Sequence, residues 1–155
     1  MPLSACLADR SVMSAWPGSE GEATHTSTFL GHPLACATAI AALETLKPAA
    51  RAEQVAERGA HLMRQLRRRL SSAPGVGDIR GAGLLVGIEL VESDSTAPAE
   101  GAAAQVAATA LQRGLLVLPA GEVSQVVELT PAVVVTDEQI DFAVDVLLAA
   151  LEGAE

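Results

Sequence analysis

The chain has 155 residues with a formal net charge of -9, and 50% of the residues are hydrophobic. This is enough apolar material for a sizeable core in one domain or two small lobes. The acidic balance argues against a nucleic-acid partner, since phosphates attract basic surfaces, and no stretch reaches the roughly 18 apolar residues of a membrane span. Only Trp16, Phe29 and Phe142 are aromatic. Small aliphatic residues must therefore fill the core, which favours closely packed helices and buried strands of the parallel type.

Cysteine and histidine are too sparse to build a disulfide framework or a metal site. Cys6 and Cys36 form no paired motif, and we expect both to be small buried residues in a reducing cytoplasm. The three histidines lack the spacing of a helical zinc pair. No metal ligand is therefore predicted, and the expected location is cytoplasmic.

The first third of the chain predicts a strand, a helical turn, a loop and a helix. Residues 2–8 are typical of a short buried strand, and Asp9 can cap the helical turn that follows. Residues 17–27 are polar and predict a loop. Helical periodicity begins after Pro33, which suits a first turn, and Lys47-Pro48 ends that helix.

A second helix is predicted over about residues 50–70. Its apolar stripe consists of Val55, Leu62, Leu66 and Leu70. A basic cluster lies opposite and has two interpretations, a solvated helix face or a contact for phosphate or a partner. The cluster consists of Arg64, Arg67, Arg68 and Arg69.

The remainder predicts a small α/β lobe with helices on one face of its sheet. Strands are expected over residues 84–91, 115–118 and 126–129, and helices over about residues 102–112 and from Thr136 onwards. Thr136 and Gln139 fit a capping box at the start of the last helix. Residues 1–30 do not belong to this lobe.

Residues 21–36 carry the most informative chemistry. Several hydroxyl residues and His25 stand just before a helix N-terminus, where backbone N–H groups and hydroxyls suit an anion such as a phosphate. The alternative is a capped helix with a Ser/Thr-rich lead-in.

Four ordered stretches resemble one enzyme family. His25-Thr-Ser-Thr-Phe-Leu-Gly-His-Pro-Leu-Ala-Cys36 is similar to a motif of the class III, ornithine/acetylornithine-type, pyridoxal-phosphate aminotransferases. The other three stretches are Met1-Pro-Leu-Ser-Ala-Cys6, Ile79-Arg-Gly-Ala-Gly-Leu-Leu-Val-Gly-Ile-Glu-Leu90 and Val126-Val-Glu-Leu-Thr-Pro-Ala-Val-Val-Val-Thr-Asp-Glu-Gln139. Together they span almost the whole chain and resemble the C-terminal third of the family.

The resemblance implies an α/β chain with the end of a fold-type I large domain followed by a small C-terminal α/β domain. Residues 1–47 would be the tail of the cofactor domain with its connecting helix, and residues 48–155 the small domain. Thr28, with Ser27 beside it, would contact the phosphate of the pyridoxal 5'-phosphate bound by the partner subunit of a dimer. A hydroxyl donor suits that dianionic ester.

Three positions depart from the family pattern. His32 stands where the family usually has Asn. Glu128 stands where many members carry an Arg that pairs with a substrate carboxylate, and Ala132 replaces a proline. Since a carboxylate does not bind another carboxylate, either an amine end of the substrate faces Glu128 or Glu128 is a strand residue that points to solvent.

The lysine content limits what this chain does alone. The cofactor chemistry requires a lysine amine. The only lysine, Lys47, precedes Pro48 at a predicted helix end, where its positive charge interacts favourably with the helix dipole. The resemblance therefore implies part of an enzyme that moves an amino group between an amino donor and a 2-oxo acid, inactive alone and with no catalytic residue in this chain. It would act as a homodimer or with a chain that supplies the lysine-bearing half. The alternatives are a stand-alone dimerisation or interaction module, or one half of a split enzyme.

Overall fold

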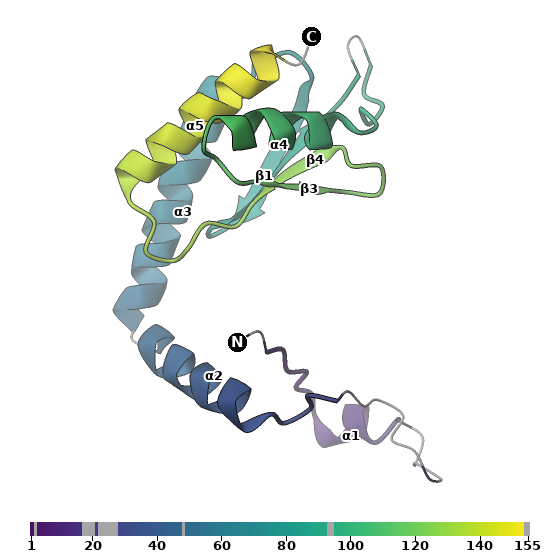
Figure 1. Cartoon of the computed structure of the whole chain (residues 1–155), viewed down its shortest axis with the longest axis vertical. Helices are drawn as coiled ribbons and strands as arrows, with labels where there is room; N and C mark the ends of the chain where they lie inside the picture. Colours follow the sequence, from purple (N-terminus) through teal and green to yellow (C-terminus); the bar gives the residue numbers. More distant parts are fainter. Residues whose placement is uncertain (2, 17–20, 22–27, 48, 93–94, 154–155) are drawn as a thin grey trace. The chain divides into compact units, whose positions relative to one another are not determined.

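The computed structural model describes residues 1, 3–16, 21, 28–47, 49–92 and 95–153. The chain divides into two compact units, Met1–Ala49 and Ala50–Glu155, and each is described by itself. The elements in chain order are α1 (Arg10–Met13), α2 (Pro33–Leu46), α3 (Ala49–Leu70), β1 (Val76–Ala82), β2 (Leu85–Leu90), α4 (Ala102–Gln112), β3 (Leu118–Ala120), β4 (Val126–Leu129) and α5 (Asp137–Glu152) (Figure 1). Among the described residues, no helix is long and apolar enough to cross a membrane.

The first unit has almost no core of its own. Ala35 is its one buried residue among those described. The predicted buried strand is wrong over residues 3–8, which are exposed and lie in no strand, because no strand is described in this unit for them to pair with. Cys6 is likewise exposed and Cys36 only half-buried, so the expected burial of both cysteines is wrong. Asp9 precedes α1 as predicted, but its side chain makes no cap hydrogen bond.

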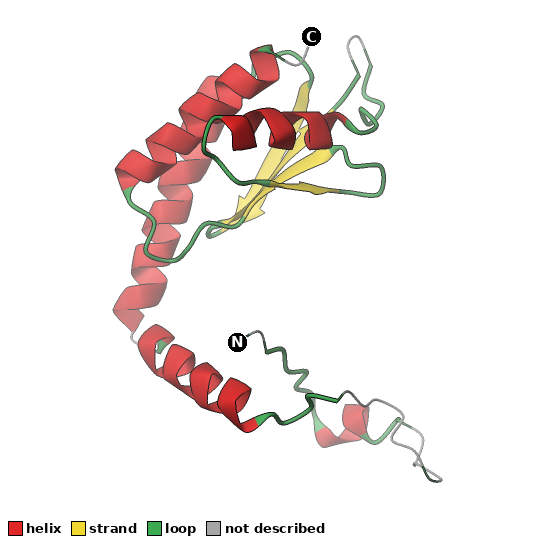
Figure 2. Ribbon diagram, viewed as in Figure 1, coloured by secondary structure: helices red, strands yellow, loops and turns green. Residues whose placement is uncertain are grey.

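The second unit is built on a four-stranded sheet in the order β1-β2-β4-β3. Figure 2 draws its strands in yellow. All three neighbouring pairs are antiparallel, so the expectation of parallel-type strands is wrong. The connection explains this result, since only Gly83 and Leu84 separate β1 from β2, and so short a link permits only an antiparallel pair. The α/β class itself is confirmed.

Burial alternates along the strands. Val86, Ile88 and Leu90 are buried, whereas the residues between them are half-buried. Across β2 and β4, Val86 pairs with Leu129 and Ile88 with Val127, so the buried side chains share one face. They form a single core with side chains of α3, α4 and α5. The helices therefore cover one face of the sheet, as predicted, and leave the other face open.

Helix α3 packs closely against the sheet. Leu62, Leu66 and Leu70 are buried, as the sequence pattern predicts. A Cβ atom added at Gly59 would lie 2.2 Å from the backbone oxygen of Gly83, in the β1–β2 turn. Because only glycine permits this approach, Gly59 sets how near the helix backbone comes to the turn.

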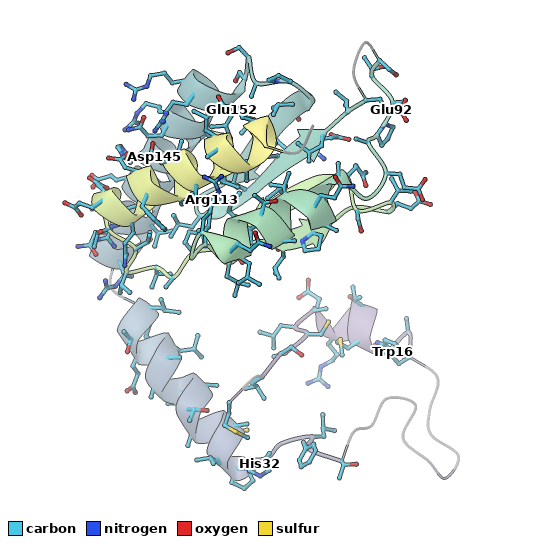
Figure 3. The ribbon with its side chains drawn as sticks, turned by 45° about the horizontal axis from the view of Figure 1, so that its top comes forward. Trp16, His32, Glu92, Arg113, Asp145 and Glu152 are labelled. Carbon is cyan, nitrogen blue, oxygen red and sulfur yellow. The ribbon has the colours of Figure 1, made fainter. Side chains whose placement is uncertain are left out.

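Polar contacts join α3 to α5 and β1. Gln65 donates a hydrogen bond to Asp141 (Nε2–Oδ1 3.0 Å), and Arg69 forms an ion pair with Asp145; Figure 3 labels Asp145 on α5. Arg67 donates to the backbone oxygen of Ile79 at 3.2 Å. Two members of the basic cluster thus bind other elements of this unit, which neither interpretation of the cluster anticipated.

The ends of the last two helices follow the sequence. Helix α4 stops at Gln112 with Arg113 as its C-cap. Thr136 accepts from the Gln139 N–H, and the Gln139 side chain accepts from the Thr136 N–H, which confirms the capping box. The pKa of Glu138 is lowered, first by its own backbone N–H and then by the Thr136 hydroxyl. The ionised Glu138 side chain therefore stabilises the folded chain at pH values above the ordinary pKa of a carboxyl group. This stabilisation is lost as the pH falls through the lowered pKa of Glu138.

Two strand positions differ from the sequence-based expectation. The sequence pattern predicts no strand over β1, which contains Gly77 and Gly81, and glycine weakens a strand. In the structure β1 pairs along its length with β2. The strand expected over residues 115–118 begins only at Leu118, as β3.

We predict that Gly59→Ala lowers the free energy of unfolding by about 1–3 kcal/mol, since the added methyl group overpacks the contact with Gly83. At an exposed helical site the same change stabilises a protein by about 0.5–1 kcal/mol. Urea denaturation measures the sign. Ala60→Gly, one residue further along α3 and exposed, is the control for helix propensity alone. A stabilised Gly59→Ala variant would contradict the close approach.

Candidate functional site

The turn before α2 carries the predicted phosphate contact. Thr28 is exposed and begins a turn that leads through Gly31, at φ +68°, into the helix. The His32 N–H closes this turn with a hydrogen bond to the Phe29 oxygen at 3.1 Å. Thr28 is therefore on the surface, close in sequence to the start of α2. Ser27 lies outside the described residues.

His32 caps α2 in place of the expected asparagine. Its Nδ1 accepts from the Ala35 N–H at a long 3.5 Å, and its ring centroid lies 6.1 Å from that of Phe29. Figure 3 labels His32 at the beginning of the helix. Pro33 follows at the first helical position and has no N–H to satisfy. The departure at position 32 thus preserves a capped helix start.

Lys47 has a position that suits a capping role. It is exposed and forms the C-cap of α2, where its backbone N–H donates to the Leu43 oxygen at 2.9 Å. An ammonium group near a helix C-terminus interacts favourably with the helix dipole. This position matches the role expected from the sequence.

Glu128 lies in an apolar groove of the second unit. The groove has a volume of about 560 Å³ and is bounded by the chain before and along β3, the end of β4, the 130–135 loop and the first turns of α5. Its most exposed apolar members are Leu116, Leu118, Val134 and Phe142. Glu128 is half-buried and is the one ionisable residue of the groove lining. Half-burial is compatible with both expectations for Glu128, a residue that faces an amine end of the substrate and a strand residue that points to solvent.

Glu128 differs from the charged residues beside it on the open face of the sheet in its lack of an ion-pair partner among the described residues. On that face Arg80 forms ion pairs with Glu89 and with Asp78 (Nη1–Oδ2 3.1 Å), and these hydrogen bonds, that to Glu89 first, raise the pKa of Arg80. Gly87 separates the two groups, since it pairs with Arg80 on one side and with Glu128 on the other. Among the described residues, Glu128 has no hydrogen-bond or ion-pair partner.

The predicted site residues belong to different parts of the chain. Thr28 is in the first unit and Glu128 in the second. Sequence reasoning missed the groove around Glu128, because its walls come from four separate segments. The one usable signal was the apolar run from Leu115 to Leu118, which was interpreted as a strand although only Leu118 belongs to β3.

We predict that Glu128→Gln changes the free energy of unfolding by no more than about 0.5 kcal/mol, since no internal partner is lost. Glu89→Gln is the matched control on the same face, and it should cost up to about 1 kcal/mol because Arg80 loses its ion pair. Added salt should shrink only the second effect. An equal loss in both variants, measured by urea denaturation, would show that Glu128 has an internal partner.

Comparison with known proteins places these features in one family. Residues 1–151 match the family described as aminotransferase class-III. Acetylornithine aminotransferase of Methanothermobacter thermautotrophicus is 38% identical over 148 residues, which cover 94% of this chain and 34% of that protein. The structure of a Bacillus anthracis aminotransferase is similar at 35% identity and a TM-score of 0.75, covering 92% of this chain and 34% of the other.

A third relative bears on the cofactor. The structure of an amine transaminase from an uncultivated Pseudomonas species, in a form with pyridoxal phosphate bound, is 29% identical with a TM-score of 0.73, covering 85% of this chain and 30% of the other. These similarities confirm the resemblance found in the sequence and the predicted fold family. The chain spans about a third of the length of these relatives. It belongs to the class III aminotransferases, a family that uses pyridoxal phosphate.

Proposed function

We propose that this chain supplies the end of the cofactor domain and the small domain of a pyridoxal-phosphate aminotransferase. Residues 1–47 would be the tail of the large domain and residues 48–155 the small domain. The complete protein would transfer an amino group between an amino donor and a 2-oxo acid, in the cytoplasm. It would form a homodimer or assemble with a chain that bears the cofactor lysine.

One observation carries the proposal. The single lysine caps the exposed end of α2, so the amine that this chemistry requires must come from residues outside this chain. The surface of α2 supports the same conclusion. Its large apolar residues are all exposed, and they are Leu34, Ile40, Leu43 and Leu46. A helix apolar on several sides needs further protein to cover it, and the body of a large domain would do so.

The residues of the first turn fit the phosphate end of the cofactor. Thr28 is exposed and close in sequence to a capped helix start, where partial positive charge favours an anion. Thr28, together with Ser27, would hold the phosphate group of the cofactor in the partner subunit. When bound, pyridoxal phosphate supplies the electron sink for amino-group transfer. The role of this chain would be to orient it.

A second function is favoured by the self-contained core of Ala50–Glu155. Buried side chains of α3, α4, α5 and the sheet form one cluster, as an independent interaction module requires. The two functions differ in what the assembled protein does. A module would bind its partner without contributing to cofactor retention or turnover.

The test is assembly with the lysine-bearing part of the protein. We expect the chain alone to show no transaminase activity and the assembly to be active. Thr28→Val, which removes only the hydroxyl, should weaken cofactor retention about tenfold, the effect of losing a hydrogen bond to a charged group. Retention is measured by dialysis against buffer without the cofactor.

Thr45→Val is the matched control, because the Thr45 hydroxyl donates to the Ala41 oxygen within α2 (2.9 Å). It should leave cofactor retention unchanged. Activity of the purified chain alone would refute the lysine argument. Unchanged retention in Thr28→Val would refute the phosphate contact, and an assembly that neither binds the cofactor nor turns over would favour the module.

A further inference from the structure

We propose that His61 and Asp141 form a proton-dependent latch between α3 and α5. When the His61 imidazole takes up a proton, its contact with the Asp141 carboxylate becomes an ion pair that holds the two helices together more firmly. The inference concerns the second unit alone and does not depend on the proposed function.

The first argument is a buried nitrogen atom without a partner. His61 lies on α3 and is half-buried, and its Nε2 atom is buried with no hydrogen-bond partner among the described residues. The Oδ1 atom of Asp141, on α5, lies 3.6 Å from it. That distance is too long for an ordinary hydrogen bond but short enough for an ion pair. A neutral ring therefore leaves Nε2 unsatisfied in either tautomer, because as an acceptor it meets no donor and as a donor it lies too far from Asp141.

The second argument is that a proton removes this deficit. A proton added to the ring gives it a positive charge opposite the Asp141 carboxylate, and the attraction between the two charges favours a shorter, charge-assisted contact. A histidine side chain ordinarily takes up its proton at about pH 6.5, where an aspartate carboxyl ordinarily stays ionised. A change in pH through this range would thus alter the charge on one side of the contact only.

The third argument is the charge around the ring. His61 lines a cavity of about 420 Å³ between α3 and the first turn of α5. The other charged side chains of its lining are the basic Arg58 and Arg64 and the acidic Glu57, Asp137 and Glu138. Arg58 is also engaged elsewhere, since it donates to the Val133 oxygen at 2.7 Å. With Asp141 the surrounding carboxylates outnumber the guanidinium groups, which favours a cation at His61.

The contact extends a row of polar contacts between the same two helices. Gln65, one turn after His61, donates to Asp141 (Nε2–Oδ1 3.0 Å), and Arg69, a further turn along, forms an ion pair with Asp145. Neither of these contacts requires a proton on His61. The latch would therefore add one charge pair to an existing row, at its end near the start of α5, without any rearrangement of the helices.

A double-mutant cycle in the full chain tests the latch by urea denaturation, at about pH 5.5 and about pH 8, on either side of the ordinary histidine range. The variants are His61→Gln, Asp141→Asn and the two combined. Asp141→Asn removes the charge but keeps an oxygen that accepts from Gln65. At the lower pH the two changes should be coupled by about two- to fivefold in the unfolding equilibrium constant, the strength of a partly exposed ion pair. At the higher pH they should be independent.

His32→Gln is the control, because His32 is likewise half-buried but lies in the first unit. It should show no coupling to Asp141→Asn at either pH. Coupling of His61→Gln to Asp141→Asn that is equal at both pH values would mean that the contact needs no proton. Absence of coupling at the lower pH would mean that no ion pair forms. Either result would overturn the inference.

Asp141→Asn alone keeps the inference testable should His61→Gln fail to fold, since Asp141 is exposed. Relative to the unmodified chain, the destabilisation caused by Asp141→Asn should be larger at the lower pH, where the charge pair is lost. A destabilisation that stays the same or shrinks as the pH falls would contradict the latch.

Discussion

The alternation of side chains across the sheet is the constraint on which the second unit depends. Every second residue of β2 and β4 is buried beneath the helices, so a shift of one residue would bury Glu89 and Glu128 in place of Ile88 and Leu129. Burying two carboxylates is far more costly than burying two aliphatic side chains. The register therefore determines both the core and the position of the carboxylate in the groove.

The same constraint explains what the sequence could predict. The starts of helices α2 and α5 are predictable because Pro33 and the Thr136–Gln139 pair mark them. Strand β1 was missed because its glycines weaken the local pattern, whereas its stability comes from pairing with β2. The exposure of residues 3–8 was missed because an apolar run predicts burial without saying which part of the protein covers it.

The residues of the candidate site also differ in how far the sequence alone predicts them. The turn around Thr28 was recognisable because its residues are contiguous, and the structure adds how His32 maintains the helix cap. The unusual charge at Glu128 was also visible in the sequence, but the groove was not, because Leu116, Val134 and Phe142 are distant in the sequence. Local chemistry was thus predictable, and surfaces assembled by packing were not.

The central claim is that the cofactor lysine lies outside this chain. It is tested most directly by adding a limiting amount of pyridoxal phosphate to the purified chain, reducing with borohydride and locating the label by mass spectrometry. We predict no stoichiometric label on Lys47, whereas the assembled protein should carry the label on its lysine-bearing part. Stoichiometric labelling of Lys47, accompanied by transaminase turnover of the chain alone, would contradict the account.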